Sequence, residues 1–221
     1  MTHRVALIHA VTVAIAPVQV AFREIWPTAD CIGLHDDSLS PDRERDQRLT
    51  DIMCRRVQAL ADYAMLAGAE GILFTCSAFG EAIDRVAKTA PAPVLKPNQA
   101  MFEAALALGD RIGMVATFAP SVASMQQEFR DIAGRAGRSE ARIDVVCVPE
   151  AMAALKAGDD QAHNRRVAEA AVGLGSHDAV LLAHFSTARA SRAVAAAVGC
   201  PVLTSPNSAV SRLRSLIDRA C

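Results

Sequence analysis

The sequence repeats itself after about 107 residues, and this duplication restricts the possible folds more than any other feature. Arg4–Ile8 (RVALI) resembles Arg111–Val115 (RIGMV) at a shift of 107 residues. Gly71–Cys76 (GILFTC) falls on Ala179–His184 (AVLLAH) at a shift of 108. One match between aliphatic segments can arise by chance, but several in the same order at nearly one shift indicate an internal repeat. The chain is therefore expected to fold as two related lobes.

Each copy has the pattern of an α/β domain. Short apolar runs without polar alternation predict parallel strands covered on both faces; they are Val5–Ile8, Ile72–Phe74, Ile112–Val115, Val145–Val148 and Val180–Leu182. Between them, Arg45–Leu66 has apolar residues three and four apart and Gly68 just beyond, which predicts a helix with a glycine C-cap. Residues 1–108 and 109–221 are thus expected to form two lobes, each with a parallel sheet flanked by helices.

Sites in parallel sheets lie beyond the carboxyl ends of the strands. If a pseudo-two-fold axis relates the lobes, these ends can face each other across one cleft. The repeat would then place Cys76 and His184, which end corresponding strands, on either side of an active site in that cleft.

Cys76 follows the apolar run GILFT and precedes a predicted helix over Glu81–Lys88. The positive end of a helix and nearby backbone N–H groups favour a thiolate. The N–H groups around Ser77 and Ala78, with the Ser77 hydroxyl, could also bind a carboxylate. A buried structural cysteine is the alternative interpretation.

His184 occupies the matching turn and is followed by Phe185 and Ser186. A histidine there could carry a proton near neutral pH, pair with a thiolate or donate to a bound carboxylate. It could equally be a structural histidine bonded to a backbone carbonyl.

Four further polar residues follow predicted strands. The Thr117 hydroxyl could bind an acid group or cap the next helix, and Thr12 is its counterpart in the first copy. Asp37 and Ser38 could reach the cleft, although an N-cap role is at least as well supported. The charged stretch after them, PDRERDQR, is interpreted as a solvated helix start.

Composition excludes several classes of function. A net charge of −1 with 4% aromatic residues argues against nucleic-acid binding. The six cysteines lack CxxC pairs and metal-ligand spacing, so reduced thiols in the cytoplasm and no metal site are expected. No phosphate-binding loop, cofactor signature or bilayer-spanning run occurs.

These residues resemble the aspartate/glutamate/hydantoin racemase superfamily, which includes maleate isomerase and arylmalonate decarboxylase. ILFTCSAFG resembles its first catalytic-cysteine segment, RIGMVATFAPSVAS the segment opening its second lobe, and AVLLAHFSTA lies where the second catalytic cysteine is normal. The resemblance implies proton transfer, without a cofactor, at a carbon next to a carboxylate or amide carbonyl. It also implies a small carboxylate or cyclic amide as substrate, a carboxylate-binding role for Thr117, and a homo-oligomer.

The sequence departs from the family where His184 replaces the second cysteine. The first hypothesis is a racemase or epimerase with Cys76 and His184 as acid/base pair. The second is a lyase of the arylmalonate decarboxylase type with Cys76 as the single proton donor. The third is a binding protein for small carboxylates that has lost turnover.

Overall fold

The computed structural model describes residues 2–220, so Cys221 lies outside the described residues. The chain divides into two compact units. Unit 1 combines the chain up to Pro97 with the segment from Ala209 onward, and unit 2 spans Asn98–Ser208.

Unit 1 is built on a four-stranded parallel sheet in the order β2-β1-β3-β4. Its strands are β1 (Arg4–His9), β2 (Asp30–His35), β3 (Gly71–Phe74) and β4 (Val94–Leu95). The central strands β1 and β3 are almost completely buried, as their continuous apolar runs predict.

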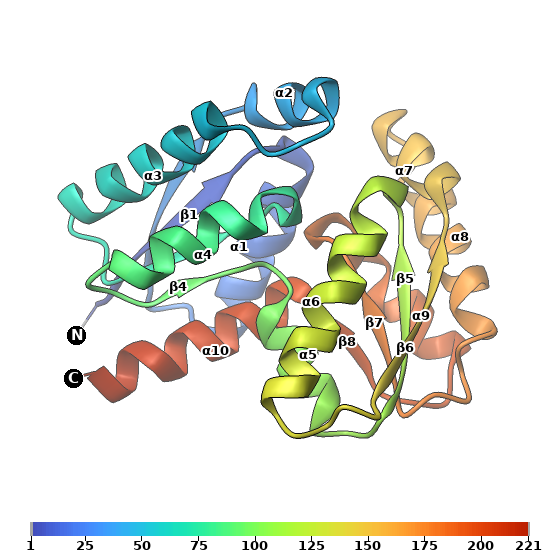
Figure 1. The fold of residues 1–221 in the computed structure, drawn as a ribbon. Helices are drawn as coiled ribbons and strands as arrows, with labels where there is room; N and C mark the ends of the chain where they lie inside the picture. The colour runs from blue at the N-terminus through green and yellow to red at the C-terminus, as the bar shows by residue number, and fades with distance from the viewer. Residues whose placement is uncertain (1, 221) are drawn as a thin grey trace. The chain divides into compact units, whose positions relative to one another are not determined.

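Unit 2 repeats this topology with the order β6-β5-β7-β8, again all parallel. Its strands are β5 (Arg111–Ala116), β6 (Arg142–Cys147), β7 (Ala179–Leu182) and β8 (Val202–Thr204). Two sheets with the same strand order confirm the predicted α/β class and the two copies (Figure 1).

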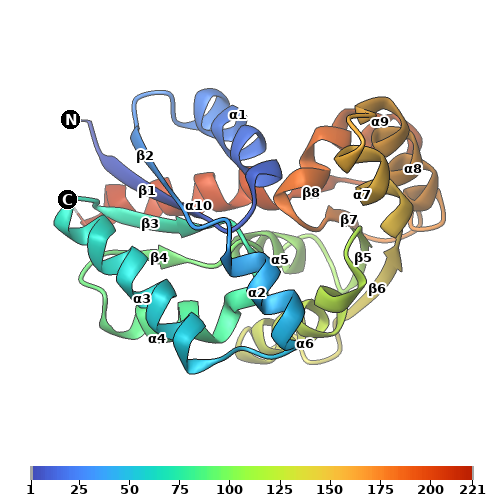
Figure 2. The same ribbon diagram turned by 90° about the horizontal axis from the view of Figure 1, so that it is seen from above.

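Helices cover both faces of the unit 1 sheet (Figures 1 and 2). Helices α3 (Asp51–Leu66) and α4 (Gly80–Thr89) bury their apolar sides against one face. The opposite face is covered by α1 (Ile15–Ile25) and α10 (Ser205–Ala220). Shorter helical segments at the carboxyl ends of the strands are η1 (Thr12–Ala14), α2 (Leu39–Asp46) and η2 (Ser77–Phe79).

Unit 2 is covered in the same way. Helices α5 (Gln99–Leu106) and α6 (Val122–Arg135) pack on one face, where the Phe102 and Phe129 rings meet edge to face at 5.6 Å. Helices α8 (Asp160–Val172) and α9 (Ser191–Ala197) pack on the other. The remaining segments are η3 (Ala119–Ser121), α7 (Pro149–Lys156) and η4 (Phe185–Ala190).

The last helix of each copy belongs to the unit of the other copy. Helix α5 comes from the first copy but packs in the core of unit 2, and α10 comes from the second copy but belongs largely to unit 1. In unit 1, Leu213 and Ile217 of α10 lie directly against Gly71 of β3. The packing units therefore differ from the division at residues 108 and 109, because a repeat records similar sequence and not the sheet on which a helix packs.

One hydrogen bond recurs in both units at the repeat spacing. In unit 1, the backbone N–H of Arg4 donates to the Glu70 carboxylate over 3.1 Å. In unit 2, the N–H of Arg111 donates to the Asp178 carboxylate over 2.8 Å. An acidic residue before the third strand thus satisfies the free amide at the start of the first strand in each copy.

The predicted helix over Arg45–Leu66 is wrong in its first part. Gln47 has a positive φ of 56°, which ends α2, and the Thr50 hydroxyl accepts a hydrogen bond from the Met53 N–H at the start of α3. A left-handed residue and an N-cap outweigh the apolar periodicity in this stretch. Within the described residues, no helix is both long and apolar enough to cross a membrane.

Candidate active site

Cys76 lies at the carboxyl end of β3, where the sequence places it. Its backbone is extended (φ −119°, ψ 122°), and it comes immediately before η2 and α4. The side chain is half-buried against the apolar core under α3 and α4. With Leu39 and Val57 it lines a cavity of about 10 Å³, which is room for about one water molecule.

Burial raises the pKa of the Cys76 thiol. The Ala78 backbone N–H and the Arg43 guanidinium both act in the other direction, but burial is the larger effect. The Ala78 amide thus acts in the direction expected at a helix start, but desolvation of the sulfur has the larger effect and favours the thiol. At neutral pH, Cys76 is a protonated thiol and can donate a proton.

Arg43 of α2 is the cationic group that acts on Cys76, although the charged stretch that contains it has the pattern of a solvated helix start. Its Nε atom is buried without a hydrogen-bond partner among the described residues. The neighbouring Arg45 and Arg56 are instead held in ion pairs with aspartates. Arg43 therefore keeps the capacity to bind an anion next to the thiol.

Other candidates from the first copy have different surroundings. Thr12 begins η1 after β1 and is exposed, as is Asp37, while Ser77 is half-buried in η2. Ser38 occupies the N-cap position of α2, but its hydroxyl makes no capping bond and donates to Asp36 over 2.8 Å.

His9 ends β1 and was not recognised from the sequence. Its ring is buried, and its Nδ1 lies 2.9 Å from the hydroxyl of Thr75, which follows β3 and precedes Cys76. Burial, with a smaller contribution from His35, lowers the pKa of His9 to about 4, so the ring is neutral at neutral pH. The one sequence signal for His9 is its position at the end of a predicted strand, which it shares with Cys76 and His184.

His184 occupies the corresponding position in unit 2, after β7. Its backbone has φ 71° and ψ 142°, a conformation that glycine adopts freely and a residue with a Cβ does not. Burial lowers the pKa of His184 to about 4, so the imidazole is neutral at neutral pH. Strained backbone of this kind is often found at functional sites.

Ser121 determines which nitrogen of His184 carries the proton. The Ser121 hydroxyl donates to the Phe118 carbonyl over 2.8 Å and lies 3.1 Å from His184 Nε2. Because a hydroxyl has a single proton, Nε2–H is the donor to the Ser121 oxygen. Nδ1 is then the bare nitrogen, and it is buried with no hydrogen-bond partner among the described residues.

After His184 Nδ1, the hydroxyl of Thr117 is the second buried polar atom that has no partner among the described residues near the carboxyl ends of β5 and β7. Its hydroxyl oxygen is buried without a partner in the described part of the chain. Thr117 directly follows β5 and His184 comes two residues after the paired strand β7, so the two residues follow the carboxyl ends of neighbouring strands. Unpaired buried polar atoms are costly, which favours a ligand that would satisfy them.

The two residues after His184 are buried. Phe185 is 1% exposed and Ser186 is 3% exposed. The Phe185 side chain thus packs inside unit 2. Thr187, which has no distinguishing sequence signal, donates to the His184 carbonyl over 2.8 Å and supports the turn that carries the histidine.

Comparisons with known proteins give one family. A family model described as Asp/Glu/Hydantoin racemase matches residues 15–213. The sequence has no significant match among curated proteins.

Solved structures share the fold at low sequence identity. The chain is similar to allantoin racemase from Klebsiella pneumoniae, with 16% identity, a TM-score of 0.73, and coverage of 99% of this chain and 89% of that one. It is also similar to the aspartate racemase of Picrophilus torridus, with 14% identity, a TM-score of 0.75, and coverage of 98% of this chain and 94% of that one. A third similar structure is a double mutant of arylmalonate decarboxylase that gains one cysteine and loses another. Its identity is 16%, its TM-score is 0.69, and the match covers 100% of this chain and 94% of that one.

Proposed function

We propose, since this chain belongs to the Asp/Glu/hydantoin racemase family, that it is a cofactor-independent racemase or epimerase of a small carboxylate or cyclic amide. Cys76 and His184 are the proposed acid/base pair. The observation that carries the proposal is the state of His184: a neutral imidazole whose bare Nδ1 is buried without a partner.

His184 suits the role of base. Its Nε2–H bond to Ser121 holds the ring in one tautomer and leaves the Nδ1 lone pair free to take a proton. Cys76 suits the role of acid, because burial keeps the thiol protonated at neutral pH. The environments of the two groups thus supply one proton acceptor and one proton donor before substrate binds.

The proposed reaction is a proton exchange at the carbon next to the carbonyl. The carbon–hydrogen bond breaks, its proton passes to His184 Nδ1, and its electron pair moves into the carbonyl to give an enolate. The Cys76 thiol then donates its proton to the opposite face of the carbon and becomes a thiolate. The reverse reaction begins from the thiolate and the imidazolium, so the enzyme interconverts both enantiomers.

Two residues are proposed to stabilise the developing negative charge. The unpartnered Thr117 hydroxyl can donate to a carboxylate or carbonyl oxygen, and Arg43 can pair with an anion beside Cys76. Both side chains have hydrogen-bonding atoms that no other described residue of the chain satisfies.

Hydrogen exchange in deuterium oxide tests the proposal. We expect a panel of 5-substituted hydantoins, allantoin and small chiral carboxylic acids to contain a compound that gains deuterium at the reacting carbon and loses optical activity, as followed by NMR and polarimetry. Replacing Cys76 by Ala or His184 by Ala should each lower the rate by about 10²–10⁴. The double variant should be little slower than either single variant, because the two groups act in one relay.

Two further variants separate a proton carrier from a hydrogen-bonding residue. His184→Gln keeps a donor but cannot titrate, and full activity in this variant would rule out histidine as a base. Cys200→Ala is the matched cysteine control and should keep the wild-type rate. Binding without deuterium exchange throughout the panel would indicate a non-catalytic binding protein.

A lyase is the second candidate, favoured by the protonated state of Cys76 and by the similarity to arylmalonate decarboxylase. A malonate-type substrate would lose carbon dioxide, and its carbon–carbon electron pair would then accept the Cys76 proton. Carbon dioxide release that needs Cys76 and survives His184→Gln would support this reaction over racemisation.

A further inference from the structure

The short helix α2 presents three different side chains on one face. Leu39, Asp42 and Arg43 are three and four residues apart, so they lie on the same side of the helix. Leu39 is the one buried residue of α2 and lines the cavity shared with Cys76. Arg43 acts electrostatically on Cys76. Two residues on this face of α2 thus lie near the thiol.

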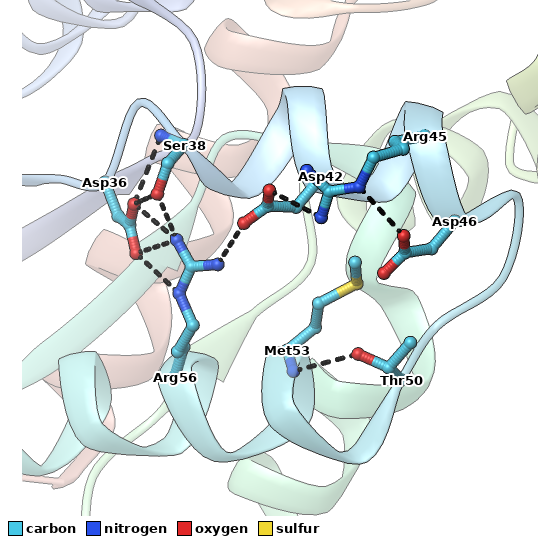
Figure 3. A network of polar contacts seen from close by, with 8 residues as sticks. All are labelled: Asp36, Ser38, Asp42, Arg45, Asp46, Thr50, Met53 and Arg56. Carbon is cyan, nitrogen blue, oxygen red and sulfur yellow. Dashed lines mark hydrogen bonds and ion pairs between the residues drawn. The ribbon is translucent and has the colours of Figure 1, made fainter.

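Arg56 of α3 connects this helix to the body of unit 1 (Figure 3). Its Nη1 lies 2.6 Å from the Asp42 carboxylate, and its Nη2 and Nε lie 2.6 and 3.0 Å from the Asp36 carboxylate. Nη2 also donates to the Ser38 hydroxyl, which in turn donates to Asp36. One guanidinium thus bonds to groups before and within α2.

These contacts are strong for a protein surface. The side chains of Arg56, Asp36 and Asp42 are 25–26% exposed, so they are partly shielded from water. The Arg56 guanidinium binds the Asp36 carboxylate through two nitrogens and the Asp42 carboxylate through its third nitrogen. Such a three-point arrangement fixes the relative positions of the side chains, whereas an ion pair with a single contact does not. Val57, next to Arg56, lines the Cys76 cavity from α3.

We propose that the Arg56 network is a clamp that holds α2 over Cys76, which makes Arg56 a positioning residue for the thiol and for Arg43. With the clamp closed, Leu39 keeps water from the sulfur and Arg43 stays beside it. With the clamp broken, α2 is held by one leucine, because the rest of the helix is polar or exposed. The proposal rests on the proposed role of Cys76.

Alkylation of Cys76 tests the clamp without any substrate, so failure of the clamp and failure of the racemase proposal are distinguishable. Iodoacetamide labelling, mapped by peptide mass spectrometry across pH 7–10, gives the rate at Cys76. We expect Arg56→Gln to raise that rate at least about tenfold at pH 8, because α2 no longer covers the sulfur. The midpoint of the pH profile should move down towards the ordinary thiol value of about 8.5, since loss of desolvation outweighs loss of Arg43.

Arg45→Gln is the matched control. Arg45 pairs with Asp42 and Asp46 inside α2 and makes no hydrogen bond or ion pair with α3 among the described residues. Its side chain is 69% exposed, so labelling should stay within about twofold of wild type. Arg56→Lys keeps the charge without the fork and should give an intermediate rate. If a turnover assay is available, Arg56→Gln should raise KM through the displaced Arg43 more than it lowers kcat.

Asp42→Asn is the second variant, and it tests the clamp if Arg56→Gln does not fold. It removes the arm of the clamp that reaches α2 and should raise the rate several-fold. Where both fold, the double variant should exceed Arg56→Gln by less than the product of the single effects. A folded Arg56→Gln or Asp42→Asn protein whose Cys76 labelling rate and pH midpoint equal those of Arg45→Gln would overturn the proposal.

Discussion

At the scale of single residues, His184 combines three unfavourable features. It has a positive φ, a buried ring nitrogen without a partner in the described residues, and a pKa lowered to about 4 by burial. The positive φ and the unpartnered nitrogen cost stability at neutral pH, and the lowered pKa costs stability when the pH falls below about 6.5. The simplest physical explanation for finding all three features at one residue is that function requires His184.

Replacing His184 by Gly should give a more stable protein than replacing it by Ala. Glycine adopts φ 71° and ψ 142° freely, whereas alanine keeps the backbone strain, so the free energy of unfolding should differ by about 1–2 kcal/mol in favour of Gly. Urea unfolding measures both variants. The matched pair is Cys76→Gly and Cys76→Ala, because Cys76 has φ −119° and Ala should be the more stable there. The same order in both pairs would contradict backbone strain at His184.

His9 should make unit 1 sensitive to acid. Its pKa is lowered to about 4 in the folded protein from about 6.5 when unfolded, so the unfolded chain takes up the proton first as the pH falls. The stability present above pH 6.5 is then lost progressively down to about pH 4, by up to about 3 kcal/mol. Urea unfolding at pH 7, 5.5 and 4.5 should show a smaller pH dependence in His9→Asn. His35→Asn removes only the smaller contribution to the His9 pKa and should change the pH dependence less, so an equal change in both variants would argue against His9.

At the scale of elements, the stretch between β2 and β3 shows how a local signal outweighs periodicity. One helix was expected over Arg45–Leu66, yet α2 and α3 are separate. The separation frees α2 to lie over Cys76 while α3 packs on the sheet. The Thr50 cap that starts α3 thus contributes to the arrangement of the site.

Thr50→Ala should destabilise the protein by about 1 kcal/mol, because the Met53 N–H loses its 3.3 Å acceptor. Thermal and urea unfolding give the change. Thr50→Ser retains the capping oxygen and should stay close to wild type. Equal losses in both variants would point to the threonine methyl group instead of the cap.

At the scale of the whole molecule, the exchange of terminal helices ties each copy to the other. The core of unit 1 includes a helix encoded at the far end of the chain, and that of unit 2 includes α5 from the first copy. Neither copy of the repeat therefore contains all the helices of one packing unit. The chain should behave as one cooperative structure and not as two independent halves.

Leu213→Ala should show this coupling. Leu213 is fully buried and lies against Gly71, so its truncation should cost about 2–5 kcal/mol. Hydrogen exchange followed by mass spectrometry should show the faster exchange in β1 and β3, more than 130 residues earlier in the chain. Leu66→Ala, at an 88% exposed site, is the control and should change stability by less than about 0.5 kcal/mol. Faster exchange confined to α10 would contradict the coupling.

The sequence alone is enough to predict the duplication, the α/β class, most of the strands, and the placement of Cys76 and His184 after corresponding strands. These features depend on local apolar periodicity and on order along the chain, which a sequence displays directly. The folded structure is needed to establish the protonation of Cys76, the tautomer of His184, the position of Arg43 and the exchange of α5 and α10. Desolvation, hydrogen bonding and helix docking depend on residues distant in sequence that the fold brings together, and no local pattern encodes which ones meet.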